Sequence, residues 1–337
     1  MTEFKASPGL WALAWRRLRA DRVAMVSLAV VALFLATLVL SATGLVASGW
    51  EKEVGVSYAP PTFIGPELAA READAIEAGP PPANAFDPLA DEIAQLRKQL
   101  AGSAASVEPA RSETLPFGAD KWGHDIVSKT IKGAETSIVV GLVAATLAVG
   151  LGTLFGAFAG YFGGLVDDFF TWFYSIFTSI PSILMILTVA AVLQTKGVLT
   201  IVLILGLTGW TGPYRLIRAE YMKHKAREYL MAADAIGASH WRKMFSHILP
   251  NVSHIALVQM SILVVGFIKA EVILSFLGFG VPVGVVSWGS MLGEAQNELI
   301  LGKWWQLAAA AGAMAVLVTA FSLFTDALRD ALDPKLK

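Results

Sequence analysis

Long apolar runs alternate with short polar segments along most of the chain. Each run is close to the roughly 20 residues that a helix needs to cross a bilayer. The pattern therefore predicts an all-α transmembrane fold with about six membrane-spanning helices. The predicted spans cover residues 23–47, 138–161, 169–193, 198–217, 252–277 and 304–323.

Helix breakers interrupt two of these runs. Pro181 lies in the middle of the run 169–193, and Pro213 lies near the end of the glycine-rich run 198–217. Proline removes a backbone hydrogen bond and clashes with the preceding turn, so it kinks or breaks a helix. We therefore expect helix hinges at Pro181 and Pro213.

The segment between the first two runs has a different pattern. Residues 49–116 are rich in proline and acidic side chains, with one helical-looking stretch at 88–100. Proline runs and net negative charge favour solvation over a packed core. Two interpretations stay open here, a partly disordered linker and an ordered extracytoplasmic cap.

Residues 117–137 carry an apolar stripe opposite polar side chains. The stripe contains Trp122, Ile126, Val127 and Ile131. This spacing is typical of an amphipathic helix, and its place before the second run predicts a helix lying on the outer membrane surface.

Basic residues give the chain a predicted orientation. Arg16, Arg17, Arg19 and Arg22 precede the first run, and residues 215–243 hold seven lysines and arginines against three acids. Cytoplasmic loops carry such an excess of positive charge. The amino end, the loop 215–250 and, by parity, the carboxyl end are predicted to be cytoplasmic.

The predicted organisation has five parts. They are a cytoplasmic segment 1–22, a first transmembrane helix 23–47, an extracytoplasmic insert with the amphipathic segment 48–133, a permease-like transmembrane domain 134–327 and a cytoplasmic tail 328–337.

Composition supports the membrane assignment and excludes several activities. The 337 residues are 55% hydrophobic and only 16% charged, with a mean hydropathy of +0.60, which is too apolar for a soluble globule. The absence of cysteine excludes disulfides and thiolate metal sites. No phosphate-binding loop and no histidine–carboxylate cluster occurs in the sequence, so we expect no ATP site, metal or cofactor in this chain.

The polar segment between the fourth and fifth runs has internal structure of its own. Residues 228–236 and 239–249 are predicted to form two short helices, with Gly237 between them. Glycine takes left-handed backbone angles readily, Ser239 is a suitable helix cap, and Pro250 suits the start of the next span. The residues alone are equally compatible with an ordinary interfacial connector.

This segment resembles a known sequence motif. Ala232-Ala233, Gly237 and Leu249-Pro250 are similar to the cytoplasmic EAA loop of binding-protein-dependent ABC importer permeases. Met231 stands where the general pattern has Glu, and His247 where it has Ile, so no ion pair carries over to Met231. These departures resemble the peptide/nickel branch of the family.

Two further segments resemble the same branch. Residues 118–137 match its segment before the second span, although His124 and Glu135 replace two arginines. Residues 274–292, LSFLGFGVPVGVVSWGSML, are similar to its outer loop. The resemblance covers nearly the whole chain except the insert.

The resemblance implies a permease subunit of an ABC importer for peptides or similar small solutes in the bacterial inner membrane. It also implies the partners, namely a second related permease, two cytoplasmic ATPase subunits that hydrolyse ATP, and an extracytoplasmic substrate-binding protein. The residues expected to couple to an ATPase subunit are Glu228, Tyr229, Met231, Ala232, Ala233, Gly237, Leu249 and Pro250.

Charged residues at membrane depth are candidates for the solute path. Lys269 and Glu271 lie toward the outer end of the fifth span. We expect Lys269 to extend its ammonium to the interface. Glu271, with Ser275 one turn later, is a possible gate residue or a structural one.

Two other classes of membrane protein were weighed. An ion-coupled secondary transporter usually shows two repeated halves and acidic residues at the bilayer midplane. A membrane-embedded enzyme needs a nucleophile, metal or acid–base cluster at one depth. The sequence shows neither pattern, and the importer subunit is the preferred interpretation.

Overall fold

The computed structural model describes residues 10–65, 92–93, 95 and 111–332 of the chain. These residues form helices joined by turns, and the only β-structure among them is a few isolated bridges. The predicted stretch 88–100 lies almost wholly outside the described residues. The helices are α1 (Leu10–Ala20), α2 (Arg22–Ala42), α5 (Ile126–Phe162), α6 (Gly164–Thr178), α7 (Ser182–Leu193), α8 (Val198–Thr208), α9 (Thr211–Lys225), α10 (Glu228–Ala235), η1 (Arg242–Ile248), α11 (Leu249–Phe276), α12 (Trp288–Ile300) and α13 (Trp305–Leu332).

The all-helical fold is confirmed, but the count of six spans is not. Within the described residues, four helices are long and apolar enough to cross a membrane, or five if the bent pair α6–α7 counts as one span. The predicted fourth span, 198–217, consists of two shorter helices, α8 and α9, that meet at Gly209 and Trp210. The break precedes Pro213, which lies in the first turn of α9, where its missing N–H costs no helical hydrogen bond.

The third predicted span breaks at Pro181, as its sequence indicates. α6 ends at Thr178 and α7 begins after Pro181, which is its N-cap residue, and the two helices make an angle of 84°. The missing N–H and the restricted backbone before a proline prevent one continuous helix.

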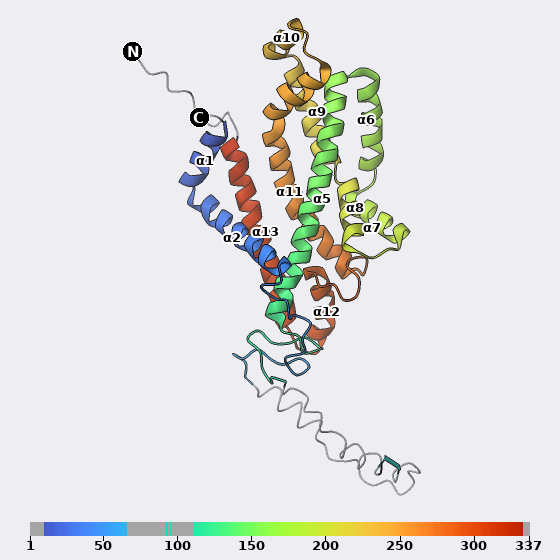
Figure 1. Ribbon diagram of the computed structural model, residues 1–337. Coiled ribbons are helices and arrows are strands. Elements are labelled where there is room, and N and C mark those ends of the chain that lie inside the picture. Colours follow the sequence, from blue (N-terminus) through green and yellow to red (C-terminus); the bar gives the residue numbers. More distant parts are fainter. Residues whose placement is uncertain (1–9, 66–91, 94, 96–110, 333–337) are drawn as a thin grey trace, which may run out of the picture.

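α5 is the central helix of the bundle (Figure 1). Gly152, Gly156 and Gly160 lie on one of its faces, against α9. A Cβ added at Gly152 would lie 2.6 Å from the carbonyl oxygen of Trp210, and one at Gly160 would lie 2.5 Å from that of Arg218. The four-residue spacing of these glycines therefore lets the backbones of α5 and α9 approach closely within one bundle.

The prediction of a separate amphipathic helix at residues 117–137 is wrong. Residues from Ile126 onward belong to α5, which is a single helix of 37 residues. Lys129, which lies outside the apolar stripe Trp122, Ile126, Val127 and Ile131, is buried at 2% exposure with carboxylate partners. Once these partners neutralise the charge, the helix no longer needs water on that side.

Residues 44–65 and 111–125 form a small ordered layer, which we call the outer cap. Isolated bridges join its two halves, for example between Gly55 and Ser112 and between Pro61 and Leu115. The indole of Trp305 in α13 donates a hydrogen bond to the carbonyl oxygen of Ala119, at 2.7 Å. The described part of the insert next to the spans is therefore ordered and attached to the bundle.

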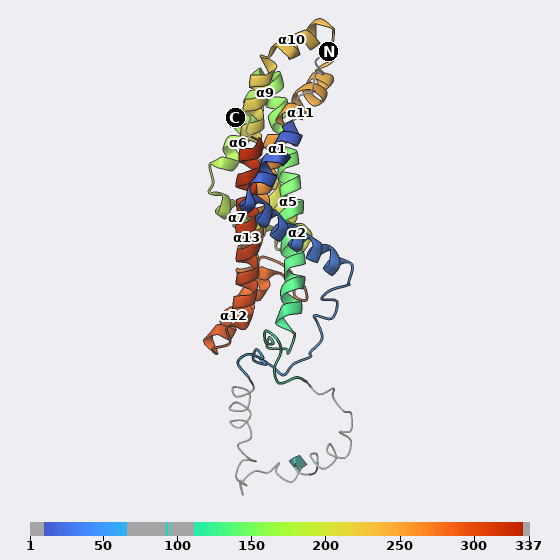
Figure 2. The same cartoon turned by 90° about the vertical axis from the view of Figure 1, so that its left-hand side faces the viewer.

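The elongated molecule has two chemically different ends. α10, α1 and the carboxyl end of α13 lie toward one end, and α12 and the outer cap lie toward the other, in both views (Figures 1 and 2). We refer to these as the α10 end and the α12 end.

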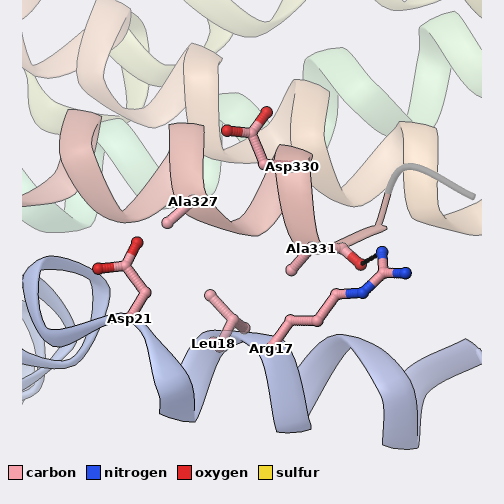
Figure 3. Close-up of a pocket in the computed structure, with 6 residues that line it drawn as sticks. All are labelled: Arg17, Leu18, Asp21, Ala327, Asp330 and Ala331. Atoms are coloured by element: carbon pink, nitrogen blue, oxygen red, sulfur yellow. Dashed lines mark hydrogen bonds between the residues drawn. The ribbon is translucent and has the colours of Figure 1, made fainter. Parts of the chain in front are cut away.

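Near the α10 end, α1 packs along the last turns of α13. Leu18 and Ala331 are buried between the two helices, and Arg17 donates a hydrogen bond to the carbonyl oxygen of Ala331 at 3.4 Å (Figure 3). Asp21 and Asp330 line the same small cavity, of about 190 Å³. This contact holds the amino-terminal helix to the bundle.

Candidate functional site

The predicted coupling segment forms a projection at the α10 end. α10 begins at Glu228, as predicted, and Gly237 ends the turn after it with φ +75°. A Cβ on Gly237 would meet nothing within 4 Å, so this position requires glycine for its backbone angle and not for close packing.

The second predicted short helix is not a separate element. Residues Arg242–Ile248 form a π-helical segment, η1, that runs directly into α11, so that 242–276 is one helix of 35 residues. The Ser239 hydroxyl accepts a hydrogen bond from the Arg242 amide at 3.3 Å, as a helix cap does. Pro250 is the second residue of α11, directly after the π-helical segment, so its missing backbone N–H falls at the junction between the two helix types.

Three tyrosines attach the projection to the ends of α5 and α9. Tyr161 bonds to His240 at 2.8 Å, Tyr229 bonds to His224 at 2.9 Å, and the hydroxyl of Tyr221 donates to the Met244 carbonyl at 3.1 Å. These contacts connect residues 229–244 to the ends of α5 and α9.

The outward side of the projection carries exposed apolar side chains beside charged ones such as Asp234. Leu230 and Ala233 face the bundle and are buried, whereas Met231, Ile236 and Trp241 are 57%, 85% and 62% exposed. An apolar cluster with this exposure is typical of a protein-binding surface. Of the predicted coupling residues, Glu228, Tyr229, Met231, Ala232, Gly237 and Pro250 are exposed, and Ala233 and Leu249 pack inward.

Glu271 lies in a second site, at the α12 end. Its side chain is fully buried and accepts hydrogen bonds from Ser137 of α5 at 2.6 Å and from Ser275 at 2.7 Å. The hydroxyl of Ser137 also accepts the backbone N–H of Trp288, the first residue of α12, at 3.2 Å. Glu271 and Ser275 thus belong to a network that joins α5, α11 and α12, and Lys269, two residues before Glu271, is exposed.

α12 lies tightly against this network. A Cβ on Gly289 would come within 2.5 Å of the Ser275 side chain, so only glycine permits this approach. The Trp288 indole is fully buried and donates to the Thr130 carbonyl at 3.1 Å. The segment between the predicted fifth and sixth spans therefore contains a packed helix.

A buried ion-pair cluster fixes the outer cap to α5 and α12. The ammonium of Lys129 lies 2.7 Å from Asp120 in the cap and 2.6 Å from Glu294 in α12. Burial favours the neutral form of Asp120, but the Lys129 charge and hydrogen bonds from Lys129 and His124 outweigh it and hold its pKa below the usual value. Gln306 of α13 bonds to Glu294 at 3.1 Å and completes the cluster.

Sequence reasoning missed most of this cluster. Asp120 lies in residues 118–137, which resemble the permease family, as does Ser137 of the Glu271 network. Trp288 of that network lies in the other resembling segment, residues 274–292. Neither sequence pattern indicates which side chains come into contact. Lys129, Glu294 and Gln306 are separated by up to 177 residues along the chain. Only the packing of α5, α12 and α13 brings them together.

A larger cavity, of about 750 Å³, opens between α9, α11 and α13 toward the α10 end. Its lining includes Glu220, Lys223 and Arg227 together with Ile255 and Ile262. The lining thus combines both signs of charge with apolar surface, and this mixture by itself selects no single class of solute.

The sequence profiles of two protein families match parts of this chain. The sequence profile of the family described as "Binding-protein-dependent transport system inner membrane component" matches residues 152–337, and that of the "N-terminal TM domain of oligopeptide transport permease C" matches residues 9–51.

Among relatives, the oligopeptide transport system permease protein OppC of Bacillus subtilis is 37% identical over 221 residues, which are 66% of this chain and 72% of that protein. The dipeptide transport system permease protein DppC of the same organism is 35% identical over 66% of this chain and 69% of its own length. DppC of Lactococcus lactis is 28% identical over 99% of this chain and 94% of its own length.

The family assignment favours an importer subunit over the ion-coupled transporter. Taken with the helical bundle, the projecting α10 segment and the apolar helices, these matches show that the chain belongs to the family of inner membrane components of binding-protein-dependent transport systems, and that it is a multi-pass membrane protein.

Proposed function

We propose that this chain is one of two permease subunits of an ABC importer that carries peptides or similar small solutes across the bacterial inner membrane. The printed names of its relatives, oligopeptide and dipeptide permeases, support the solute class. In this proposal the α10 end faces the cytoplasm and two ATPase subunits, and the α12 end faces an external substrate-binding protein.

The observation that carries the proposal is the exposed apolar surface of the α10 projection. Met231, Ile236 and Trp241 expose apolar side chains at the end of the molecule where Lys223, Lys225 and Arg227 gather. Positive charge marks cytoplasmic segments. A groove on an ATPase subunit would cover this surface, and the tyrosine contacts would transmit its movement to α5 and α9.

The α6–α7 bend and the α8–α9 break supply places where the bundle can deform. Pro181 and Pro213 lie beside these breaks. Hinge motion usually takes place at a few residues at the ends of elements. We propose that closure of the ATPase pair moves α10 as a rigid body, and that these breaks turn the movement into opening at the α12 end, where Glu271 and Ser275 contribute to the gate.

Replacing an exposed apolar residue of α10 by a charge tests the docking role. Ile236→Asp should abolish co-purification of the ATPase subunits and ATP-driven uptake in reconstituted vesicles, because a carboxylate does not enter an apolar groove. The side chain is 85% exposed, so the free energy of unfolding should change by less than about 0.5 kcal/mol.

Val283→Asp is the matched control. Val283 is also a fully exposed apolar residue, but it lies in the turn before α12, at the other end. ATPase assembly should be normal in this variant. Equal ATPase assembly in Ile236→Asp and Val283→Asp would show that α10 is not the docking surface.

A further inference from the structure

Glu298 is the one buried carboxylate at the α12 end without a side-chain partner among the described residues. It lies near the end of α12, its side chain is 1% exposed, and neither carboxylate oxygen has an ion-pair or side-chain hydrogen-bond partner, so that the Lys121 backbone amide is the one donor beside it. Burying an ionised carboxylate without partners is strongly unfavourable, so such a group is held in its neutral, protonated form.

Charged groups from every surrounding element face this carboxyl. Asp120 comes from the outer cap, Glu294 from the preceding turn of α12, and Lys129 from α5. Tyr58 faces it from the other half of the cap. The Lys303 amide donates to the backbone carbonyl of Glu298 at 2.9 Å, and its ammonium lies over the Trp305 ring, 5.8 Å from the ring centroid.

The nearby Lys129 does not neutralise Glu298. Its ammonium has three donors, and its contacts are with Asp120 at 2.7 Å, Glu294 at 2.6 Å and Gln306 at 3.4 Å. His124, the nearest imidazole of the cluster, is paired with Asp120 at 2.9 Å. Asp120, Glu294 and Glu298 would therefore share one lysine if all three were ionised.

We propose that Glu298 is a proton-binding site at the contact between α12 and the outer cap, occupied while the two are packed together and emptied when they separate. Separation of the cap would let water reach the carboxyl, and hydration would stabilise its ionised form. With the α12 end facing outward, as in the proposed function, external pH would then bias this end, with acid favouring the packed arrangement and alkali the separated one. This linkage is a property of the contact itself and does not depend on the solute or on the ATPase partners.

The direction of the pH effect follows from the electrostatics. Burial raises the pKa of Glu298, the Lys129 charge and a hydrogen bond from the Lys121 amide lower it, and the Asp120 and Glu294 charges raise it. The net pKa is about 7. A group whose pKa is raised in the packed state stabilises that state fully below its hydrated pKa, and this contribution is lost as the pH rises through the raised value. With a hydrated value near 4.3, the separated fraction should rise about tenfold between pH 6 and pH 8.

The chain lacks cysteine, which makes a labelling test direct. Ala119→Cys places one thiol at a fully buried position where the cap meets Trp305. The complete transporter, reconstituted in vesicles, is treated with a membrane-impermeant maleimide at pH 6, 7 and 8, with and without the additional change Glu298→Gln. Because thiol chemistry is the same in both proteins, the ratio of their labelling rates reports only the Glu298 linkage.

The expected result is a ratio that rises about tenfold from pH 6 to pH 8. The cap variant Glu113→Gln is the control, because Glu113 is exposed, and it should label like the parent at each pH. A ratio that stays constant with pH would overturn the proposal.

Infrared difference spectra between pH 6 and pH 8 give a second, independent readout. They should contain the carbonyl band of a protonated carboxylic acid, and Glu298→Gln should remove it. Spectra without such a band, or with a band that survives in Glu298→Gln, would overturn the assignment even if the labelling were affected by altered folding.

Discussion

The α10 end and the α12 end differ in which side chains they place in an unfavourable environment. At the α10 end, the apolar side chains of Met231 and Ile236 face solvent. At the α12 end, the charged side chains of Asp120 and Lys129 are almost completely buried. The first arrangement is incomplete until a partner covers it, whereas the second is satisfied within the chain.

The contacts that hold each end show the same difference. The α10 projection is attached by tyrosine hydrogen bonds and by a buried apolar cluster that includes Leu230 and Met244. Its own salt bridge, between Asp234 and Lys243, includes a carboxylate that is 70% exposed. α12 is held by the Lys129 cluster, by Trp288 and by the serines around Glu271. We therefore expect substitutions at the α12 end to affect stability most, and substitutions at the α10 end to affect partner binding.

The largest effect should come from removing the buried ammonium. Lys129→Met leaves Asp120 and Glu294 facing each other without a cation, and loss of one partner of a buried pair costs about 3–5 kcal/mol. Thermal unfolding of the purified transporter should show a large drop in midpoint. Lys132→Met is the control, because its pair with Glu135 is partly exposed and contributes about 1 kcal/mol or less. Equal midpoints for the two variants would mean that the cluster does not stabilise this end.

A smaller effect is expected from Ser137→Ala. This change removes a donor to Glu271 and the acceptor of the Trp288 amide, and unsatisfied buried groups cost about 1–3 kcal/mol. Hydrogen exchange should quicken at the start of α12 before it does so elsewhere. Thr146→Val provides the comparison, since the Thr146 hydroxyl is exposed and donates only within α5. Unchanged hydrogen exchange at α12 in Ser137→Ala would show that Ser137 does not stabilise the start of α12.

A smaller effect on stability than at Lys129 or Ser137 is expected at Gly237. A β-branched residue there must adopt φ near +75°, which costs about 1–2 kcal/mol locally, and Asn tolerates this region better. Gly237→Val should therefore leave the unfolding midpoint nearly unchanged but reduce ATPase stimulation in vesicles, and Gly237→Asn should retain most of it. A large loss of stability in Gly237→Val would contradict the view that the α10 end is only loosely attached.

Several elements were predictable because local chemistry fixes them. The break at Pro181 follows from the missing N–H, and the turn at Gly237 from a backbone angle that glycine adopts readily. The four-residue spacing of the glycines in α5 permits a close approach of another helix, but it does not indicate that this helix is α9. The π-helical junction into α11 and the helical character of residues 288–300 were not predicted, because short amphipathic stretches are compatible with several arrangements.

By itself, the sequence determined that the chain is helical, that its long apolar runs belong in a membrane and that a polar segment with a dividing glycine separates two of them. These properties depend on composition and on neighbours a few residues apart. Only the tertiary structure decided that Lys129 is buried, that Glu271 joins α12 to α5, and that Glu298 has no side-chain partner among the described residues. The environment of a charge is set by residues from helices distant in sequence, and no local pattern records which of them will meet.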